Sequence, residues 1–307
     1  MPRELDAEEL EKAGHKKRKK GPPVAVFAGS GVADGKANDA KVATWTYQWG
    51  FITEPVLKRI LNVTYSVSAR YCISEKKDKK TGEIKYAGKG VLQKVATRPG
   101  LCTPYVLTGH GLNIARKNWT GENLGYPWPK SRLPTQQLNH DEMSQILALS
   151  LIGDGGELQA EREYKDGKPG ALPDFIISRP GGVIEWHETE INGKDEPDKI
   201  KLTFQIQERV EAFRRGEFTK LIWHFDKEGD RKAMIKQMAN DSLPYISREN
   251  HKYSQDINTK GLNPSDLAAV SEYKLIDQEL SIFDKKLEEI RDKRNAAALA
   301  KFEAMHL

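Results

Sequence analysis

Cysteine is scarce in this chain, since only Cys72 and Cys102 occur among 307 residues. Two cysteines at this separation form neither a disulfide framework nor a metal-ligand motif. Long apolar runs are also missing, and we find neither a stretch long enough to span a bilayer nor a signal-peptide core. These absences lead us to expect a cytoplasmic protein without a membrane span.

Charge is plentiful but unevenly distributed. Residues 1–137 carry 24 Lys and Arg against 12 Asp and Glu, a net charge of +12, and the remainder carries 25 against 32, a net charge of −7. A basic front half is typical of a partner that is a polyanion, and an acidic back half suits a cation. We therefore expect salt-sensitive nucleic-acid binding to reside in residues 1–137.

The first 40 residues are rich in charge, Gly and Ala, with "KKRKKGPP" at their centre. This composition predicts a disordered basic arm over residues 1–40. Two interpretations stay open, because such an arm can contact phosphates or serve only as a solubilising tail.

Residues 41–117 have the pattern of a small DNA-binding domain. Helices are expected at about 37–50, at 53–61 with Thr53 as N-cap and Pro55 in the first turn, and at 64–80. Short strands are expected between 83 and 111. Three helices followed by a β-ribbon is the order of a winged helix-turn-helix, and "YVLTGHG" (105–111) resembles the closing wing strand of that family.

Several polar side chains of this domain are candidates for contact with DNA. In a winged helix the third helix enters the major groove, and the wing meets phosphates. The alternative is a winged helix that is used for protein contacts. The candidates are Ser66, Ser68, Arg70 and Lys76 on the third helix, and Lys94 and Arg98 on the wing.

A stretch rich in Gly and Pro, residues 118–137, predicts a linker before a second domain at 138–262. The second domain has the predicted order α-β-β-β-α-β-α, so the fold class is mixed, α+β or α/β. Residues 263–307 are expected to form a long C-terminal helix. Its apolar residues have heptad spacing over a short length, which favours packing on its own domain over dimerisation; they are Tyr273, Ile276, Leu280, Phe283, Leu287 and Ile290.

The stretch "LPDFIISRPGGVIEWHETEI" (172–191) predicts a β-hairpin with an unusual amount of negative charge. Side chains alternate faces along a strand, so Glu188 and Glu190 share one face, with roughly 7 Å between their Cα atoms. A three-residue loop at 180–182 sets Asp174 opposite Glu188 on that face. A loop of two or four residues sets Asp174 opposite His187 instead.

Three carboxylates on one face of a sheet repel one another, and burying them unpaired is costly. A divalent cation removes this cost, and ligands that are all oxygen favour Mg²⁺ or Mn²⁺. We therefore expect Asp174, Glu188 and Glu190 to bind such a metal, which can orient a phosphate and activate water. The alternative is a solvated sheet edge whose acids pair with Lys and Arg.

Pro173-Asp174, followed by a strand with Glu188-Thr189-Glu190, resembles the PD-(D/E)xK restriction-endonuclease-like superfamily over roughly residues 138–228. The resemblance implies that the acidic trio is catalytic. One departure is that Glu190 occupies the position of the usual lysine. Some members have Glu there and others supply the lysine from the next helix, where Lys201 and Lys199 lie here. Glu142 and Glu163 are further candidates for an upstream acidic ligand.

A winged helix followed by this core, with "HETE" (187–190) after the Asp strand, resembles the MOBC class of plasmid mobilisation relaxases. It is also similar to replication-relaxation family proteins. The resemblance implies a metal-dependent endonuclease that nicks double-stranded DNA at a plasmid origin, with accessory mobilisation proteins and a coupling ATPase as partners. His187 would support the site from the opposite face, or is a plain surface or core histidine.

Two other functions stay open. One is a replication initiator or repressor that binds DNA with an inactive nuclease-like core, and the other is an ordinary hydrolytic nuclease. A relaxase commonly forms a covalent bond between a tyrosine and DNA. The chain has ten tyrosines, Tyr245 and Tyr253 among them, and the sequence does not select one.

Overall fold

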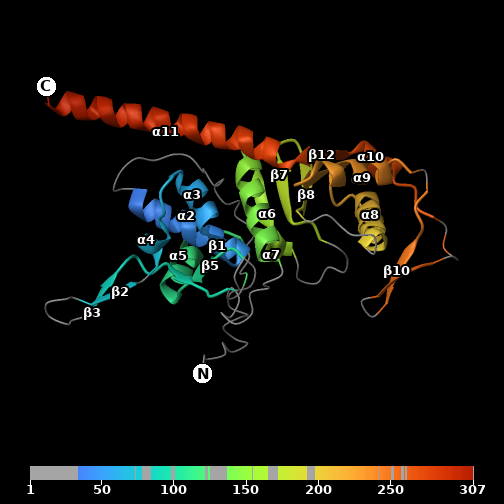
Figure 1. Cartoon of the computed structure of the whole chain (residues 1–307), viewed down its shortest axis with the longest axis horizontal. Helices are drawn as coiled ribbons and strands as arrows, with labels where there is room; N and C mark the ends of the chain where they lie inside the picture. Colours follow the sequence, from blue (N-terminus) through green and yellow to red (C-terminus); the bar gives the residue numbers. More distant parts are fainter. Residues whose placement is uncertain are drawn as a thin grey trace.

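The structure, a computed structural model, is a mixed α and β fold in which two parts lie side by side, and a long helix, α11, begins at the second part and extends over the N-terminal part (Figure 1). The mixed fold class expected from the sequence is confirmed at this level. The described residues are 34–72, 74–77, 84–97, 101–121, 124, 137–153, 155–164, 172–191, 198–240, 242–249, 252–256, 259 and 261–306.

The N-terminal part combines helices with a small antiparallel sheet of order β1-β5-β4. Its helix α3 buries Val56, Leu57 and Ile60 on one face and ends at Asn62, which has a left-handed backbone with φ of 50°. Thr53 is the N-cap residue, as expected, but its side chain makes no capping hydrogen bond. The elements are α2 (Asp34–Trp49), β1 (Ile52–Thr53), α3 (Glu54–Leu61), α4 (Ser68–Tyr71), β2 (Ser74–Lys77), β3 (Ile84–Ala87), β4 (Leu92–Lys94), β5 (Pro104–Leu107) and α5 (Gly109–Asn118).

Three details of this part differ from the sequence prediction. The third helix covers only α4, because the chain turns at Cys72 and residues 74–77 pair with 84–87 as the β2–β3 hairpin. The end of the expected wing strand instead begins α5, where Thr108 accepts a hydrogen bond from the Gly111 N–H as a side-chain cap. Residues 34–40, expected in the basic arm, are helical, and residues 1–33 lie outside the described residues.

The second part is built on a five-stranded sheet of order β12-β9-β8-β7-β6. Strands β6, β7 and β8 are antiparallel neighbours, and β8, β9 and β12 run parallel. The order α-β-β-β-α-β-α expected for 138–239 is present, with the short helix α7 added. The elements are α6 (Leu138–Leu151), β6 (Glu157–Ala160), α7 (Glu161–Tyr164), β7 (Phe175–Arg179), β8 (Val183–Glu190), α8 (Asp198–Arg214), β9 (Lys220–Phe225) and α9 (Glu228–Met238).

The β7–β8 hairpin has the register that the three-residue loop predicts. Arg179 pairs with Val183 and Phe175 with His187, so the loop consists of residues 180–182. Gly181 and Gly182 have φ of 86° and 83°, values that a residue with a Cβ rarely adopts. Asp174 is the residue before Phe175, so it lies opposite Glu188 at the end of the hairpin. Its N–H donates to the His187 carbonyl at 3.0 Å.

The end of the chain is more varied than one long helix. A hairpin of β10 (Ile246–Glu249) and β11 (Lys252–Gln255) is followed by α10 (Ser265–Ala269), the edge strand β12 (Ser271–Leu275) and α11 (Ile276–His306). The prediction that Tyr273 begins the heptad seam was wrong, since it lies in β12, which extends the parallel sheet beside β9. From Ile276 onward the seam packs inward, with Phe283 and Leu287 buried in the protein's own core.

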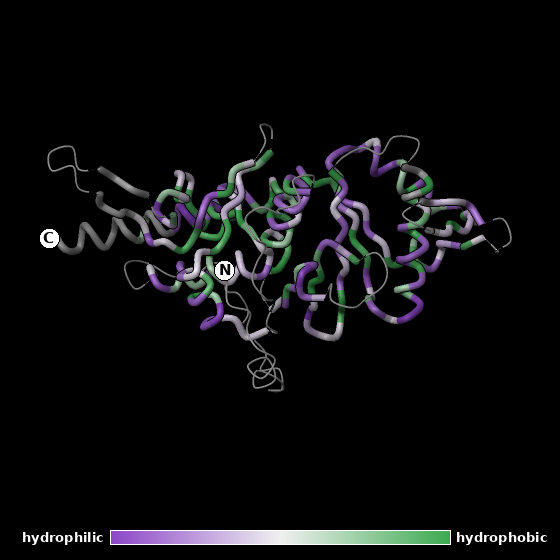
Figure 2. Tube along the Cα trace, turned by 90° about the horizontal axis from the view of Figure 1, so that it is seen from below, coloured by the Kyte–Doolittle hydropathy of each residue, from purple (hydrophilic) through white to green (hydrophobic). Residues whose placement is uncertain are grey.

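One apolar core joins the two parts. It combines Val42 and Leu57 of the N-terminal part with Leu147 and Phe175 of the second part and with Phe283 of α11. The tube in Figure 2 shows apolar segments inside both parts of the molecule. A second core, centred on Trp223, fills the other face of the sheet under α8 and α9.

Within the described ranges, no helix is both long and apolar enough to cross a membrane.

Candidate functional site

The three predicted acids lie at one end of β7 and β8. Asp174 immediately precedes β7, and Glu188 and Glu190 are the sixth and eighth residues of β8. Glu188 is 6 % exposed and Glu190 is half-buried. The charges of Asp174 and Glu190 both act on Glu188, so the fold gathers the three carboxylates in one neighbourhood.

Glu188 is a carboxylate in a dry environment with one strong partner. Burial, together with the charges of Asp174 and Glu190, raises the pKa of Glu188 to about 7 despite the opposing effect of Arg209. The Arg209 Nε donates to Glu188 Oε1 at 2.5 Å, and its Nη2 donates to the Leu172 carbonyl at 3.1 Å. The Arg209 guanidinium lies 5.6 Å from the centre of the Trp186 ring. A carboxyl group with this pKa can exchange a proton near neutral pH.

His140 of α6 and the backbone of Thr189 in β8 hold Asp174 in place. Its Oδ2 accepts the Thr189 N–H at 2.6 Å and lies 3.3 Å from His140 Nε2. Burial disfavours the charge of Asp174, but His140, the Thr189 N–H and Arg209 outweigh it and lower its pKa. The charge of Asp174 in turn raises the pKa of His140 far above its ordinary value, so this imidazole is a cation at neutral pH.

Four residues of this neighbourhood were missed by the sequence analysis. Arg209 had a signal, because it occupies the apolar stripe of α8 near Ile206 and Val210, and the structure buries it to 2 %. The other three, His140, Asp141 and Tyr164, had none. Asp141 Oδ1 lies 3.3 Å from His140 Nδ1, and the Tyr164 hydroxyl donates to the Pro173 carbonyl.

The other predicted acids and lysines have different positions. Glu163 connects the two parts of the protein. Its Oε1 accepts a hydrogen bond from Gln48 Nε2 in the N-terminal part at 2.5 Å and one from the Ala160 N–H in the second part at 2.8 Å. Glu142 lies on α6, and its Oε1 is buried without a hydrogen-bond partner among the described residues. Lys199 and Lys201 lie on α8, but their side chains are outside the described set.

The donor chemistry of the acidic trio fits a hard divalent cation, since all the donors are carboxylate oxygens. Among the described residues, however, no three His, Cys, Asp or Glu side chains are arranged to hold a metal ion. The carboxylates are instead engaged by Arg209 and His140. Convergence of Asp174, Glu188 and Glu190 on one ion therefore stays a prediction.

The opposite face of β8 carries a separate polar chain. His187 is fully buried, its ring stacks on Phe175, and its Nδ1 lies 3.0 Å from His224 Nε2. His224 Nδ1 lies 2.6 Å from Glu279 of α11, so the chain connects the sheet to that helix. Burial lowers the pKa of His187 to about 4, and no described contact links its side chain to the acidic trio.

The predicted DNA-binding side chains that the structure describes fall into two groups. The backbone N–H groups of Val67 and Ser68 donate to the Glu54 carboxylate, to which the Ser66 and Ser68 hydroxyls also bind, so these serines fix the turn before α4. Arg70 on α4 and Lys94 on β4 are exposed. The Lys76 side chain and all of Arg98 lie outside the described residues.

No family model, curated protein or solved structure matches this chain significantly.

Proposed function

We propose that this protein is a DNA strand-nicking enzyme of the cytoplasm, of the kind that mobilises plasmids. The observation that carries the proposal is the buried carboxylate Glu188, with a pKa of about 7, between the charges of Asp174 and Glu190. Perturbed carboxyl groups of this kind are concentrated at catalytic sites, because proton transfer is most effective when the pKa is near the working pH.

The N-terminal part supports the binding half of the proposal. Its sheet of order β1-β5-β4 with α2, α3 and α4 agrees with a winged helix-turn-helix, in which the β4–β5 connection is the wing. Residues 41–137 carry 16 Lys and Arg against 5 Asp and Glu, a net charge of +11. The exposed side chains of Arg70 and Lys94 would contact phosphates, which fix the protein on the duplex.

Within the site, the residues of this chain have distinct roles in the proposal. The Arg209 Nε donates to Glu188 Oε1 and holds this carboxylate in place. Asp174, Glu188 and Glu190 would hold Mg²⁺ or Mn²⁺. When bound, this ion supplies Lewis-acid polarisation of the phosphate. The MOBC resemblance adds a plasmid origin as substrate and a coupling ATPase among the partners.

A second candidate is a replication initiator or repressor with an inactive core. Arg209 and His140 favour it, because they already compensate the charges of Glu188 and Asp174 without a metal. Buried ion pairs of this kind also occur as purely structural elements.

The test is nicking of supercoiled plasmid DNA that carries the cognate origin, with Mg²⁺ or Mn²⁺ present. We expect the wild-type chain to nick and both Asp174→Ala and Glu188→Gln to lose nicking while they keep DNA binding. Glu157→Ala is the matched control, because Glu157 is an exposed carboxylate on the same sheet. Glu185 is unsuitable, since it is buried and its Oε2 accepts Arg179 Nε at 2.9 Å.

Binding without nicking by the wild-type chain under either metal would establish the initiator or repressor. A DNA adduct that survives denaturant would distinguish a relaxase from a hydrolytic nuclease, because only a covalent intermediate persists under those conditions.

A further inference from the structure

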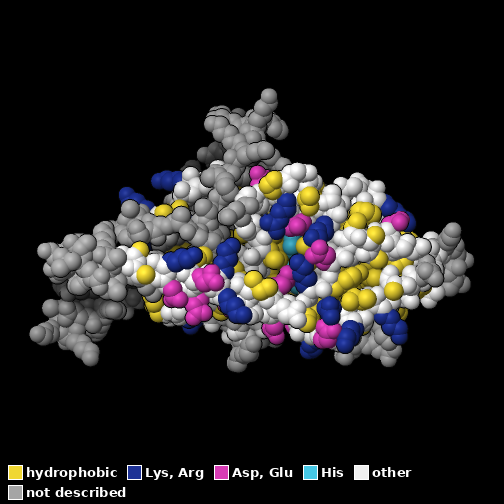
Figure 3. Space-filling model, turned by 90° about the horizontal axis from the view of Figure 1, so that it is seen from above, with side chains coloured by type: hydrophobic (Ala, Val, Ile, Leu, Met, Phe, Trp, Pro, Cys, Tyr) yellow, Lys and Arg dark blue, Asp and Glu magenta, His cyan; other side chains and the backbone are white. Residues whose placement is uncertain are grey.

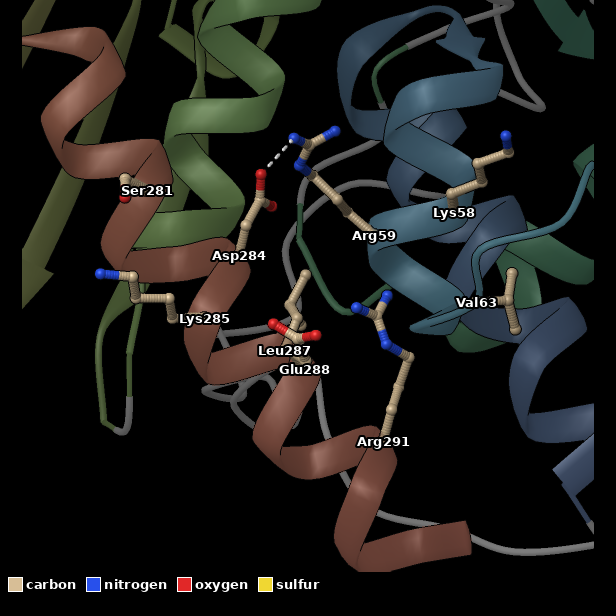
Figure 4. Close-up of a pocket in the computed structure, with 9 residues that line it drawn as sticks. All are labelled: Lys58, Arg59, Val63, Ser281, Asp284, Lys285, Leu287, Glu288 and Arg291. Carbon is tan, nitrogen blue, oxygen red and sulfur yellow. Dashed lines mark hydrogen bonds and ion pairs between the residues drawn. The ribbon is translucent and has the colours of Figure 1, made fainter.

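A groove separates the second half of α3 from the first half of α11 (Figure 4). It has a volume of about 530 Å³, and its walls come from two elements far apart in the sequence. Figure 4 shows Arg291 extending from α11 toward α3 and Arg59 extending from α3 toward α11. The charged side chains that line the groove are Lys58, Arg59, Lys285, Arg291, Asp284 and Glu288.

The groove has more positive charge than its own acids neutralise. Four cations and two carboxylates line the groove. Figure 4 shows Lys58 and Lys285 extending outward from it, whereas Arg59 Nη2 pairs with Asp284 Oδ2 at 3.2 Å across it. Over the described part of the chain, Lys58, Lys285 and Arg291 form no ion pair. In addition, Arg59 Nε is buried without a hydrogen-bond partner among the described residues. An acceptor that entered the groove would satisfy this buried donor.

These features select the chemistry of the occupant. The charge excludes an apolar ligand, and paired guanidinium groups are the side chains that bind phosphate oxygens best. The helix α3 also belongs to the part of the chain with a net charge of +11. On the face seen in Figure 3, basic and acidic side chains lie side by side along α11, whereas apolar side chains gather toward α9 and α10.

We infer that this groove binds a phosphate of the DNA backbone, so that α3 and α11 together contact the duplex at a place separate from α4 and the wing. The inference rests on the proposed DNA binding and adds to it a contact that does not involve α4 or the wing. The long helix α11 would then contact the bound DNA in addition to packing in the apolar core.

The test measures how the affinity of the full chain for a duplex oligonucleotide of random sequence depends on salt. The test variant carries Arg291→Gln, which leaves the Arg59–Asp284 ion pair in place. The matched control carries Lys293→Gln, an exposed α11 position that does not line the groove. Both variants lose the same charge, and a thermal melt of each verifies that the fold is retained.

Each lost phosphate contact reduces the slope of log K against log salt by about 0.9, so we expect the groove variant to lose about 0.9 units of slope. The control should keep the wild-type slope. Equal slopes in all three proteins, or an equal loss in both variants, would overturn the groove while leaving DNA binding intact. If the wild-type chain bound no duplex at any salt concentration, the proposed function would fall with it. A further outcome is that the groove variant alone loses binding of poly-glutamate while its duplex binding is unchanged. That result would overturn the phosphate contact and identify an acidic peptide as the ligand.

Discussion

At the scale of single residues, the notable group is Glu188, which the fold removes from water and places beside two other carboxylates. Arg209 compensates the charge only in part, since the pKa of Glu188 is still raised from 4.5 to about 7. Ionised Glu188 is therefore unfavourable in the folded protein. Such a group lowers the stability of the fold and provides a reactive side chain in exchange.

The first prediction concerns stability against pH. Because the pKa of Glu188 is raised, the folded chain holds a proton between about pH 4.5 and pH 7 that the unfolded chain releases. Stability therefore falls as the pH rises through this window. Glu188→Gln cannot ionise, so relative to wild type it should gain on the order of 1–3 kcal/mol between pH 5 and pH 8. Urea unfolding of both proteins at the two pH values measures this, and a constant difference between them would contradict it.

At the scale of elements, the β7–β8 hairpin determines which acids meet. Its register was predictable because alternation and the Pro-Gly-Gly loop are local properties of the sequence. If the loop were one residue longer or shorter, Asp174 would face His187 in place of Glu188. The two glycines of the loop thus contribute to the site without touching it.

The second prediction tests these glycines. Gly181 has φ of 86° and open space around its missing Cβ, so an alanine there would meet no atom but would strain the backbone. Gly181→Ala should lower the free energy of unfolding by roughly 1–2 kcal/mol. Gly229→Ala is the control, since Gly229 also has open space but lies in α9, where alanine is favoured. Equal effects of the two changes in chemical denaturation would show that the loop conformation is unstrained.

Elements that depend on distant partners were less predictable. Residues 64–80 have a helical pattern near Val67 and Tyr71, yet pairing of Ser74–Lys77 with Ile84–Ala87 ends the helix at Tyr71. Tyr273 fits the heptad spacing of α11 but lies in β12, where a place beside β9 is available. His140 reaches Asp174 from α6 across a separation that no local pattern encodes.

At the scale of the whole molecule, the two parts share their interior. Trp45 Nε1 donates to Gln145 Oε1 at 2.9 Å, and Arg162 Nη1 donates to the Tyr47 carbonyl at 2.6 Å. These bonds join the N-terminal part to α6 and α7, in addition to the common apolar core. The two sides of the predicted linker, residues 118–137, are thus directly in contact.

The third prediction follows from the shared core. The full chain should unfold in one transition, with far-UV circular dichroism and tryptophan fluorescence coinciding. A fragment of residues 138–307 should melt at a lower temperature and bind an apolar dye, because it exposes the faces that Val42 and Leu57 cover. A fragment as stable as the full chain would show that the N-terminal part is dispensable for folding.

The shared core also has a geometric consequence for DNA. If one part binds the duplex and the other cleaves it, packed side chains fix the distance between the binding site and the cleavage site. A flexible linker would leave that distance variable. The protein would then place its nick at a constant number of base pairs from the bound sequence. Inserting a half turn of DNA between the two would move the scissile bond to the far side of the helix, out of reach.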